Sequence, residues 1–338
     1  MINFEYTRAT DVAGAVRDVS AEASARFIAG GTNLIDLMKE DVERPGHLID
    51  ISRLPLNKVE ETAEGGVRIG ALVPNSDLAY HPLIEQRYPM LSSAILAGAS
   101  AQLRNMASTG GNLLQRTRCH YFYDTATPCN KREPGSGCSA KDGLNRMHAI
   151  LGTSEACIAT HPSDMCVALA ALGANVRATG PAGERVIAFA DFHRLPGDTP
   201  QRDTNLQRDE IVTAIELPPK GFAQNYTYLK IRDRLSYAFA LVSTAAGLEL
   251  DGGTIKEARL ALGGVAHKPW RETAAEDALR GQTANEAAFA RAADILLNGA
   301  KGFSHNAFKI ELARRTMIRA LTQAAQGTPQ SQANKKIR

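Results

Sequence analysis

The chain has 338 residues, which at about 100–200 residues per domain predicts two or three packed units. Hydrophobic residues make up 44% and charged residues 22%. The formal net charge is +3, so basic and acidic residues are too nearly balanced for a nucleic-acid-binding protein. The longest apolar run, Val167 to Leu172, is far below a membrane span, and the N-terminus has no signal-peptide pattern.

A small β-α-β unit is predicted for residues 1–54. The run Arg26 to Ala29, which is apolar after its first residue, predicts a strand, and a Gly30-Gly31 turn follows it. Leu34, Leu37 and Met38 then recur at helical spacing. The short run 47–51 predicts the second strand.

Residues 55–175 contain a second glycine turn. A strand at 67–73 and helical patterning at 77–103 precede Gly110 and Gly111. Adjacent glycines let backbone N–H groups approach an anion closely, so the two turns could hold both phosphates of a dinucleotide. A lone Gly-Gly pair is also typical of a simple hairpin. Neither turn is a G-x-G-x-x-G motif, and no P-loop is present.

All five cysteines fall within 48 consecutive positions, and they are Cys119, Cys129, Cys138, Cys157 and Cys166. Residues 117–146 show no periodicity, and so long a loop normally indicates function or disorder. Four thiolates at irregular spacing suit a [4Fe–4S] cluster, with Lys131 and Arg132 supplying positive charge. Zinc, disulfides or reduced structural thiols are the alternatives. Cys166 begins an apolar helix and is predicted to be core.

Ser163 and Asp164 precede that helix, and either could cap it or bind a ligand. The histidines show no metal-binding spacing, and no catalytic residue is predicted. Strands are predicted at 211–217, 226–231, 238–250 and 258–264, with a hairpin turn at Asp251-Gly252-Gly253. Helices at about 284–298 and 304–325 follow. The polar residues 327–338 are expected to be disordered.

Several of these segments resemble the FAD-binding medium subunit of the molybdenum hydroxylases, the xanthine dehydrogenase family. They are Phe27 to Leu34, Ser108 to Leu113, and Ser163-Asp164. The cysteine loop is similar to the flavin subunit of bacterial periplasmic aldehyde oxidoreductases. The segments that carry this similarity are 116–119, 128–132, 134–138 and 154–164, together with 261–271.

The resemblance implies an α+β fold, with a two-part FAD-binding domain (PCMH-type) followed by a C-terminal α+β domain of antiparallel sheet and helices. The expected units are 1–54, 55–175 with the cluster loop at about 117–157, 176–326, and the tail 327–338. It also implies that Cys119, Cys129, Cys138 and Cys157 ligate a [4Fe–4S] cluster. The residues implied to bind FAD are Phe27, Ile28, Ala29, Gly30, Gly31, Thr32, Asn33, Leu34, Ser108, Thr109, Gly110, Gly111, Asn112, Ser163, Asp164 and Lys230.

The activity implied is that of an electron-transfer subunit of a molybdenum-dependent aldehyde oxidoreductase. A molybdopterin-binding large subunit and a [2Fe–2S] small subunit would complete a heterotrimer and deliver electrons through FAD to an external acceptor. Co-export with a signal-bearing partner implies a periplasmic location, and the cytoplasm is the alternative.

Three other functions remain open at this point. One is the flavin subunit of a 4-hydroxybenzoyl-CoA reductase-like enzyme, whose cluster loop is expected to differ. A non-enzymatic zinc-bound interaction module is the second. The third is a stand-alone flavin oxidase, for which no substrate base can be identified.

Overall fold

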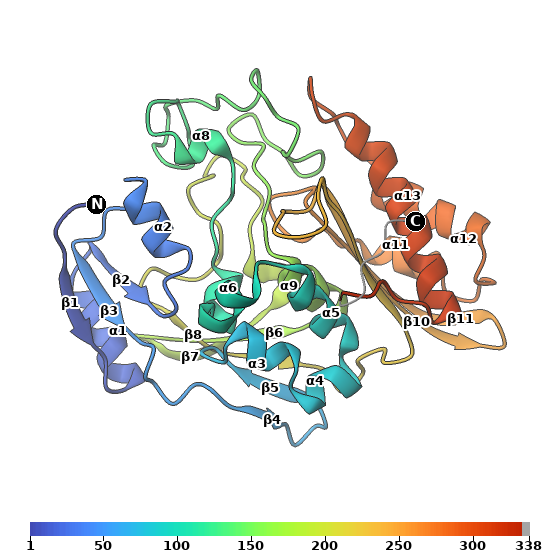
Figure 1. Ribbon diagram of the computed structural model, residues 1–338, viewed down its shortest axis with the longest axis horizontal. Helices are drawn as coiled ribbons and strands as arrows, with labels where there is room; N and C mark the ends of the chain where they lie inside the picture. The colour runs from blue at the N-terminus through green and yellow to red at the C-terminus, as the bar shows by residue number, and fades with distance from the viewer. Residues whose placement is uncertain (333–338) are drawn as a thin grey trace.

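The N-terminal unit of the computed structural model is a three-stranded parallel sheet with two helices (Figure 1). The structure describes residues 1–332. The strand order is β1-β3-β2, and Asp11 caps the first helix by accepting a hydrogen bond from the Gly14 N–H at 2.7 Å. The predicted strands at 26–29 and 47–51 are β2 and β3. The elements are β1 (Glu5–Arg8), α1 (Val12–Ala21), β2 (Ala25–Ile28), α2 (Leu34–Lys39) and β3 (His47–Asp50).

A five-stranded antiparallel sheet forms the middle of the molecule, in the order β4-β5-β8-β6-β7. Its strands are β4 (Val59–Glu61), β5 (Val67–Gly70), β6 (Asn175–Gly180), β7 (Gly183–Ala188) and β8 (Ile211–Leu217). Short helices accompany it. They are α3 (Asn75–Ala79), α4 (Pro82–Arg87), α5 (Pro89–Ala97), α6 (Ala101–Met106), α7 (Thr109–Leu113), α8 (His120–Tyr123), α9 (Asp164–Leu172) and α10 (Phe189–Phe192).

The predicted domain boundary at residue 176 is wrong. Strand β8 pairs with β5 on one side and β6 on the other, with Val67 opposite Leu217. Residues 175–217 therefore belong to the sheet that begins at β4, and the chain passes to the next domain after β8. The sequence pattern missed this because pairing between strands about 150 residues apart leaves no local signal.

The C-terminal domain is an antiparallel sheet in the order β11-β10-β9, with helices packed against it (Figure 1). The predicted hairpin turn is confirmed, since Asp251 pairs with Thr254 and both intervening glycines have positive φ. The elements are β9 (Asn225–Ile231), β10 (Val242–Asp251), β11 (Thr254–Gly263), α11 (Thr273–Asp277), α12 (Glu286–Leu296) and α13 (Phe308–Gln326). The fold is thus α+β, as predicted.

Helix α9 lies between the middle and C-terminal domains, and every one of its nine residues is buried. It packs against α5 on one side and against β10 and β11 on the other. Val167 fits closely against Gly263, where an added Cβ would lie 2.5 Å from a Val167 methyl group. The first residues of α9 are therefore held firmly at the junction of the two domains.

The predicted disorder of the tail is wrong for residues 327–332. Gln330 accepts a hydrogen bond from the Lys230 N–H at 3.1 Å and donates its own N–H to Thr227 at 3.0 Å. This segment therefore lies along β9. Residues 333–338 lie outside the described part of the chain. Within the described part, none of the helices is long and apolar enough to cross a membrane.

Candidate functional site

A cavity of about 860 Å³ lies where the N-terminal unit, the middle domain and β9 meet. Nearly all of the residues that were predicted to bind FAD line this cavity. Those lining it are Phe27, Ile28, Ala29, Gly30, Gly31, Thr32, Asn33, Leu34, Ser108, Gly110, Gly111, Asn112, Ser163, Asp164 and Lys230. Four separate segments of the chain thus contribute to one site.

The first glycine turn, between β2 and α2, requires both of its glycines. A Cβ on Gly30 would lie 1.9 Å from the Met106 carbonyl oxygen, so the turn packs directly on α6. Gly31 has a φ of +70°, which side chains rarely adopt. The turn therefore presents bare backbone to the cavity.

The second glycine turn forms the first part of α7. Ser108 caps this helix by accepting the Gly111 N–H at 3.2 Å, and the Gly110 N–H binds the Ala71 carbonyl oxygen at 2.7 Å. Thr109 does not line the cavity: its hydroxyl donates to the Val73 carbonyl oxygen at 2.8 Å, and the residue is buried. Thr109 was predicted to bind FAD, but its side chain has a structural role instead.

Asparagine side chains hold the two turns in position and leave donors free. Asn112 donates to Asn75 Oδ1 at 2.6 Å and accepts the Ser163 hydroxyl at 2.6 Å. Asn33 Oδ1 accepts the Arg116 N–H at 2.8 Å. The amide nitrogens of Asn33 and Asn75 are buried and have no partner among the described residues. Because buried donors are normally paired, these nitrogens fit a polar ligand such as a dinucleotide.

Asp164 stands at the inner part of the cavity as the first residue of α9. Its Oδ2 lies 2.7 Å from Lys230 Nζ, and its Oδ1 accepts the Tyr228 hydroxyl at 2.7 Å. Burial and the nearby Asp164 charge raise the pKa of Tyr228 well above its usual value. Ser163 is the residue that caps α9, accepting the Cys166 N–H at 3.0 Å. The sequence analysis missed Tyr228, although it lies two residues before Lys230 and so on the same face of β9.

The four clustered cysteines meet at a second site. Cys119, Cys129, Cys138 and Cys157 all line one small cavity, and the cysteines are free thiols. Among the described residues, these four sulfurs do not form a group of three or more within 4.8 Å of one another. A zinc ion bound at about 2.3 Å would draw its ligands closer.

Burial suppresses ionisation of these thiols. It raises the pKa of Cys119 to about 12 and that of Cys157 to about 11. Because a metal binds the thiolate, a bound group would have to displace these protons.

The segment around the cysteines, residues 117–160 (the cysteine segment), has a small core of its own. Phe122 and Ile158 are fully buried there together with Leu37 of α2. Arg132 donates to the carbonyl oxygens of Tyr121 and Phe122, both at 2.8 Å. Arg132 therefore organises the backbone of the segment.

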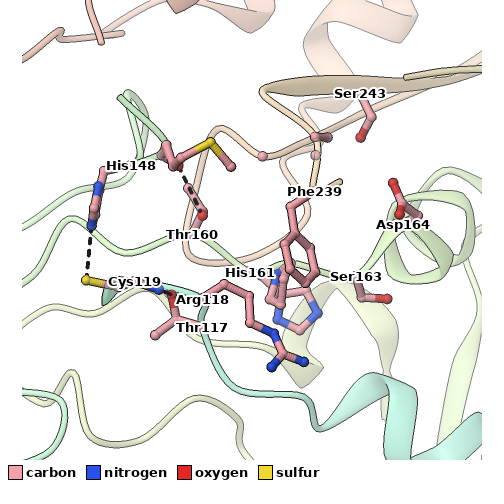
Figure 2. A pocket seen from close by; sticks show the side chains of 15 residues that line it. Thr117, Arg118, Cys119, His148, Thr160, His161, Ser163, Asp164, Phe239 and Ser243 are labelled. Atoms are coloured by element: carbon pink, nitrogen blue, oxygen red, sulfur yellow. Dashed lines mark hydrogen bonds between the residues drawn. The ribbon is translucent and has the colours of Figure 1, made fainter. Parts of the chain in front are cut away.

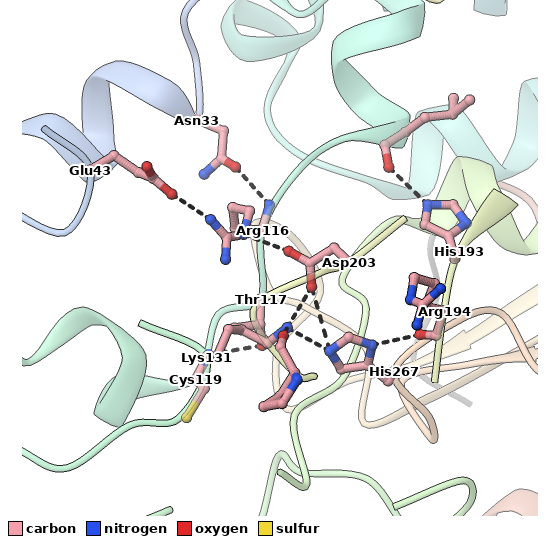
Figure 3. Close-up of polar contacts among 12 residues, drawn as sticks. Asn33, Glu43, Arg116, Thr117, Cys119, Lys131, His193, Arg194, Asp203 and His267 are labelled. Carbon is pink, nitrogen blue, oxygen red and sulfur yellow. Dashed lines mark hydrogen bonds and ion pairs between the residues drawn. The ribbon is translucent and has the colours of Figure 1, made fainter. Parts of the chain in front are cut away.

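Lys131 also has a different role from the one predicted (Figure 3). It is buried and pairs with Asp203, and its Nζ lies 2.6 Å from His267 Nε2. Asp203 also pairs with Arg116. Although burial raises the pKa of the Asp203 carboxyl, Lys131 and Arg116 together hold that pKa well below its usual range. This network joins the cysteine segment to the segment that follows α10.

A small cavity of about 30 Å³ separates the two sites (Figure 2). Cys119 and His148 line one part of it, and Ser163 and Asp164 line another. His148 Nε2 lies 3.0 Å from Cys119 Sγ. The cysteine site and the large cavity are therefore neighbours.

Cys166 is fully buried in α9, as predicted. Its sulfur lies within 4.8 Å of ring nitrogens of His161 and His193. Burial lowers the pKa of His193 to about 4 and that of His161 well below its usual value, so both imidazoles are neutral at pH 7.

Family models match almost the whole chain. Residues 2–220 match the FAD binding domain in molybdopterin dehydrogenase, and residues 226–324 match the CO dehydrogenase flavoprotein C-terminal domain. The transition between the two matches falls in the segment between β8 and β9.

Curated relatives and solved structures agree with these matches. The chain is 53% identical to the aldehyde oxidoreductase FAD-binding subunit PaoB of Escherichia coli, over 95% of this chain and 98% of that protein. It is 28% identical to the glyceraldehyde dehydrogenase medium chain of Sulfolobus acidocaldarius, over 84% and 83%. The fold is similar to carbon monoxide dehydrogenase from Hydrogenophaga pseudoflava, with a TM-score of 0.76, 26% identity and coverage of 97% and 99%.

Proposed function

The chain belongs to the FAD-binding subunits of the molybdenum hydroxylases, an oxidoreductase family, and from this premise we propose that it is the electron-transfer subunit of an aldehyde oxidoreductase. In this proposal it carries FAD and a [4Fe–4S] cluster. Electrons from an aldehyde would reach it from partner molybdenum and [2Fe–2S] centres and leave to an external acceptor. The support for the aldehyde is the 53% identity to PaoB over nearly the full length.

The large cavity is the observation that supports the FAD site. The bare backbone of the first glycine turn, Gly30-Gly31, suits the diphosphate. The free amide donors of Asn33 and Asn75 suit the sugar and ribityl oxygens. When bound, FAD supplies the redox chemistry of the subunit. Lys230 and Asp164 place a paired cation and anion at the inner part of the cavity. The protein thus contributes binding, orientation and charge.

The donor set at the second site supports the iron–sulfur cluster. Four buried or half-buried thiols line one small cavity, and four cysteines are the usual ligand set of a [4Fe–4S] cluster. We propose Cys119, Cys129, Cys138 and Cys157 as the ligands. The cluster would mainly brace the segment that joins α2, the middle domain and the C-terminal domain, with modest tuning of electron transfer.

The proposal includes two partner subunits and a location. A molybdopterin-binding large subunit and a [2Fe–2S] small subunit would complete the heterotrimer, and a signal on a partner would carry the complex to the periplasm. Family membership supports the two partner subunits. The similarity of the cysteine segment to periplasmic aldehyde oxidoreductases supports the periplasmic location. Cell fractionation with and without the partner genes tests both.

The deciding experiment measures cofactors on the purified protein under anaerobic conditions. We expect one FAD with about four irons and four acid-labile sulfides per chain. Cys129→Ala should lose iron and sulfide, whereas the matched Cys166→Ala, which removes the buried thiol of α9, should keep both. Zinc in place of iron, or iron retained in Cys129→Ala, would refute the cluster assignment. A protein without FAD would refute the whole proposal.

A further inference from the structure

His148 provides a side-chain contact to one of the four clustered thiols. Its Nε2 lies 3.0 Å from Cys119 Sγ, within hydrogen-bond distance for sulfur. The two residues come from opposite ends of the cysteine segment, 29 positions apart. Figure 2 shows the His148 ring directed at the sulfur, on the side of the small cavity that faces away from Asp164.

The main chain of His148 is fixed by the C-terminal domain. Its carbonyl oxygen accepts Lys309 Nζ at 2.7 Å and Asn306 Nδ2 at 3.2 Å, and its N–H binds the Asn145 carbonyl oxygen at 2.9 Å. Lys309 and Asn306 are completely buried. Because these bonds are shielded from water, the imidazole is held at a defined distance from Cys119.

The surroundings of the ring decide which nitrogen carries the proton. His148 Nδ1 is buried and has no partner among the described residues, so a proton there would be an unsatisfied buried donor. A cluster-bound Cys119 is a thiolate and can only accept a hydrogen bond. Both facts put the proton on Nε2, which makes the contact an N–H···S hydrogen bond.

We infer that His148 is a positioning residue that donates a hydrogen bond to Cys119 and thereby raises the reduction potential of the iron–sulfur group. This inference rests on the proposed cluster. A donor to a ligand sulfur stabilises the additional negative charge of the reduced state, and hydrogen bonds to sulfurs are among the factors that set cluster potentials. The effect is strong here because Cys119 and His148 are both buried, where hydrogen bonds face little competition from water.

The test is a potentiometric titration of the purified complex, followed by electron paramagnetic resonance. His148→Leu removes the donor, His148→Gln retains an N–H, and His120→Leu removes the exposed imidazole next to it. We expect His148→Leu to lower the equilibrium constant for cluster reduction about tenfold, a shift of about 59 mV for a one-electron couple. His148→Gln and His120→Leu should stay close to the unsubstituted protein.

A second measurement covers the case in which His148→Leu fails to retain its cluster. Electron–nuclear double resonance of the unsubstituted complex in D₂O should detect an exchangeable deuteron coupled to the reduced cluster, and His148→Gln should alter that coupling. An unchanged potential in His148→Leu at full iron content would overturn the inference, as would the absence of such a deuteron. A complex without iron and sulfide would instead refute the proposed cluster itself.

Discussion

Lys230 Nζ lies 2.7 Å from Asp164 Oδ2, and both side chains are at least nine-tenths buried beside the large cavity. Lys230 comes from the C-terminal end of β9 and Asp164 from the start of α9, 66 residues apart. The ion pair therefore links the C-terminal sheet to the helix that separates the two domains. Its second bond, from Lys230 to the Ala97 carbonyl oxygen at 3.1 Å, adds α5 to the same junction.

Lys230→Met should lower the free energy of unfolding by about 3 kcal/mol, because it leaves the buried Asp164 charge without its cation. FAD content should fall with it. Chemical denaturation and flavin release measure the two effects. The matched control is Lys220→Met, which breaks an exposed pair with Glu249 and Glu257 and should cost less than about 1 kcal/mol. Equal losses of unfolding free energy in the two variants would contradict the role of Lys230 as the cation that compensates the buried Asp164 charge.

Gly30→Ala should release FAD. The new Cβ would lie 1.9 Å from the Met106 carbonyl oxygen, so the first glycine turn must move away from α6. The ratio of bound flavin to protein after gel filtration measures the loss, which should be at least tenfold. The control Gly14→Ala sits inside α1, where the nearest atom to a Cβ is 3.4 Å away. It should keep FAD and stabilise the chain by about 1 kcal/mol.

The parts of the site that follow from local sequence could be predicted. Gly30-Gly31 and Gly110-Gly111 are turn signals that need no distant partner, and both line the cavity. The apolar run of α9 likewise predicted a buried helix. Lys131 shows where this approach fails. Its partner Asp203 is 72 residues away, and no pattern near Lys131 indicates a buried ion pair rather than a contact with the cluster.

The predicted domain boundary at residue 176 was wrong for the same reason. Residues 175–180, 183–188 and 211–217 form antiparallel strands, and composition alone could not assign these strands to one sheet or another. Only the register of β5 against β8 places them in the middle domain. Tyr228 and Asn75 were missed because their hydrogen bonds to Asp164 and Asn112 depend on side-chain orientations that arise from tertiary packing.

Arg132→Ala should loosen the cysteine segment. It leaves the carbonyl oxygens of Phe122 and Thr127 without their side-chain donor and removes one of the two donors to the Tyr121 carbonyl oxygen. An unpaired carbonyl group costs about 1–3 kcal/mol when buried. We expect faster limited proteolysis within 117–160 and a lower iron content. Arg146→Ala, which breaks an exposed pair with Asp233, should change neither. Unaltered proteolysis of Arg132→Ala would show that the small core alone holds the segment.

His193 should make the protein sensitive to acid. Burial lowers its pKa to about 4 in the folded chain, whereas an unfolded chain has a histidine pKa near 6.5. Above pH 6.5 the imidazole is neutral in both states and stability is unaffected. Below that pH the unfolded chain takes up a proton that the folded chain does not, so stability falls until the pH reaches about 4.

His193→Gln should flatten this part of the stability curve. Glutamine does not titrate, and its amide can still donate to the Leu113 carbonyl oxygen, which His193 Nε2 contacts at 2.9 Å. A shift from 6.5 to about 4 corresponds to about 3 kcal/mol, so the difference should be clear in melting temperatures measured from pH 7.5 to pH 4. His305→Gln, at an exposed position, should follow the unsubstituted protein. If the melting temperature of His193→Gln fell with pH as steeply as that of the unsubstituted protein and of His305→Gln, other buried groups would account for the acid sensitivity.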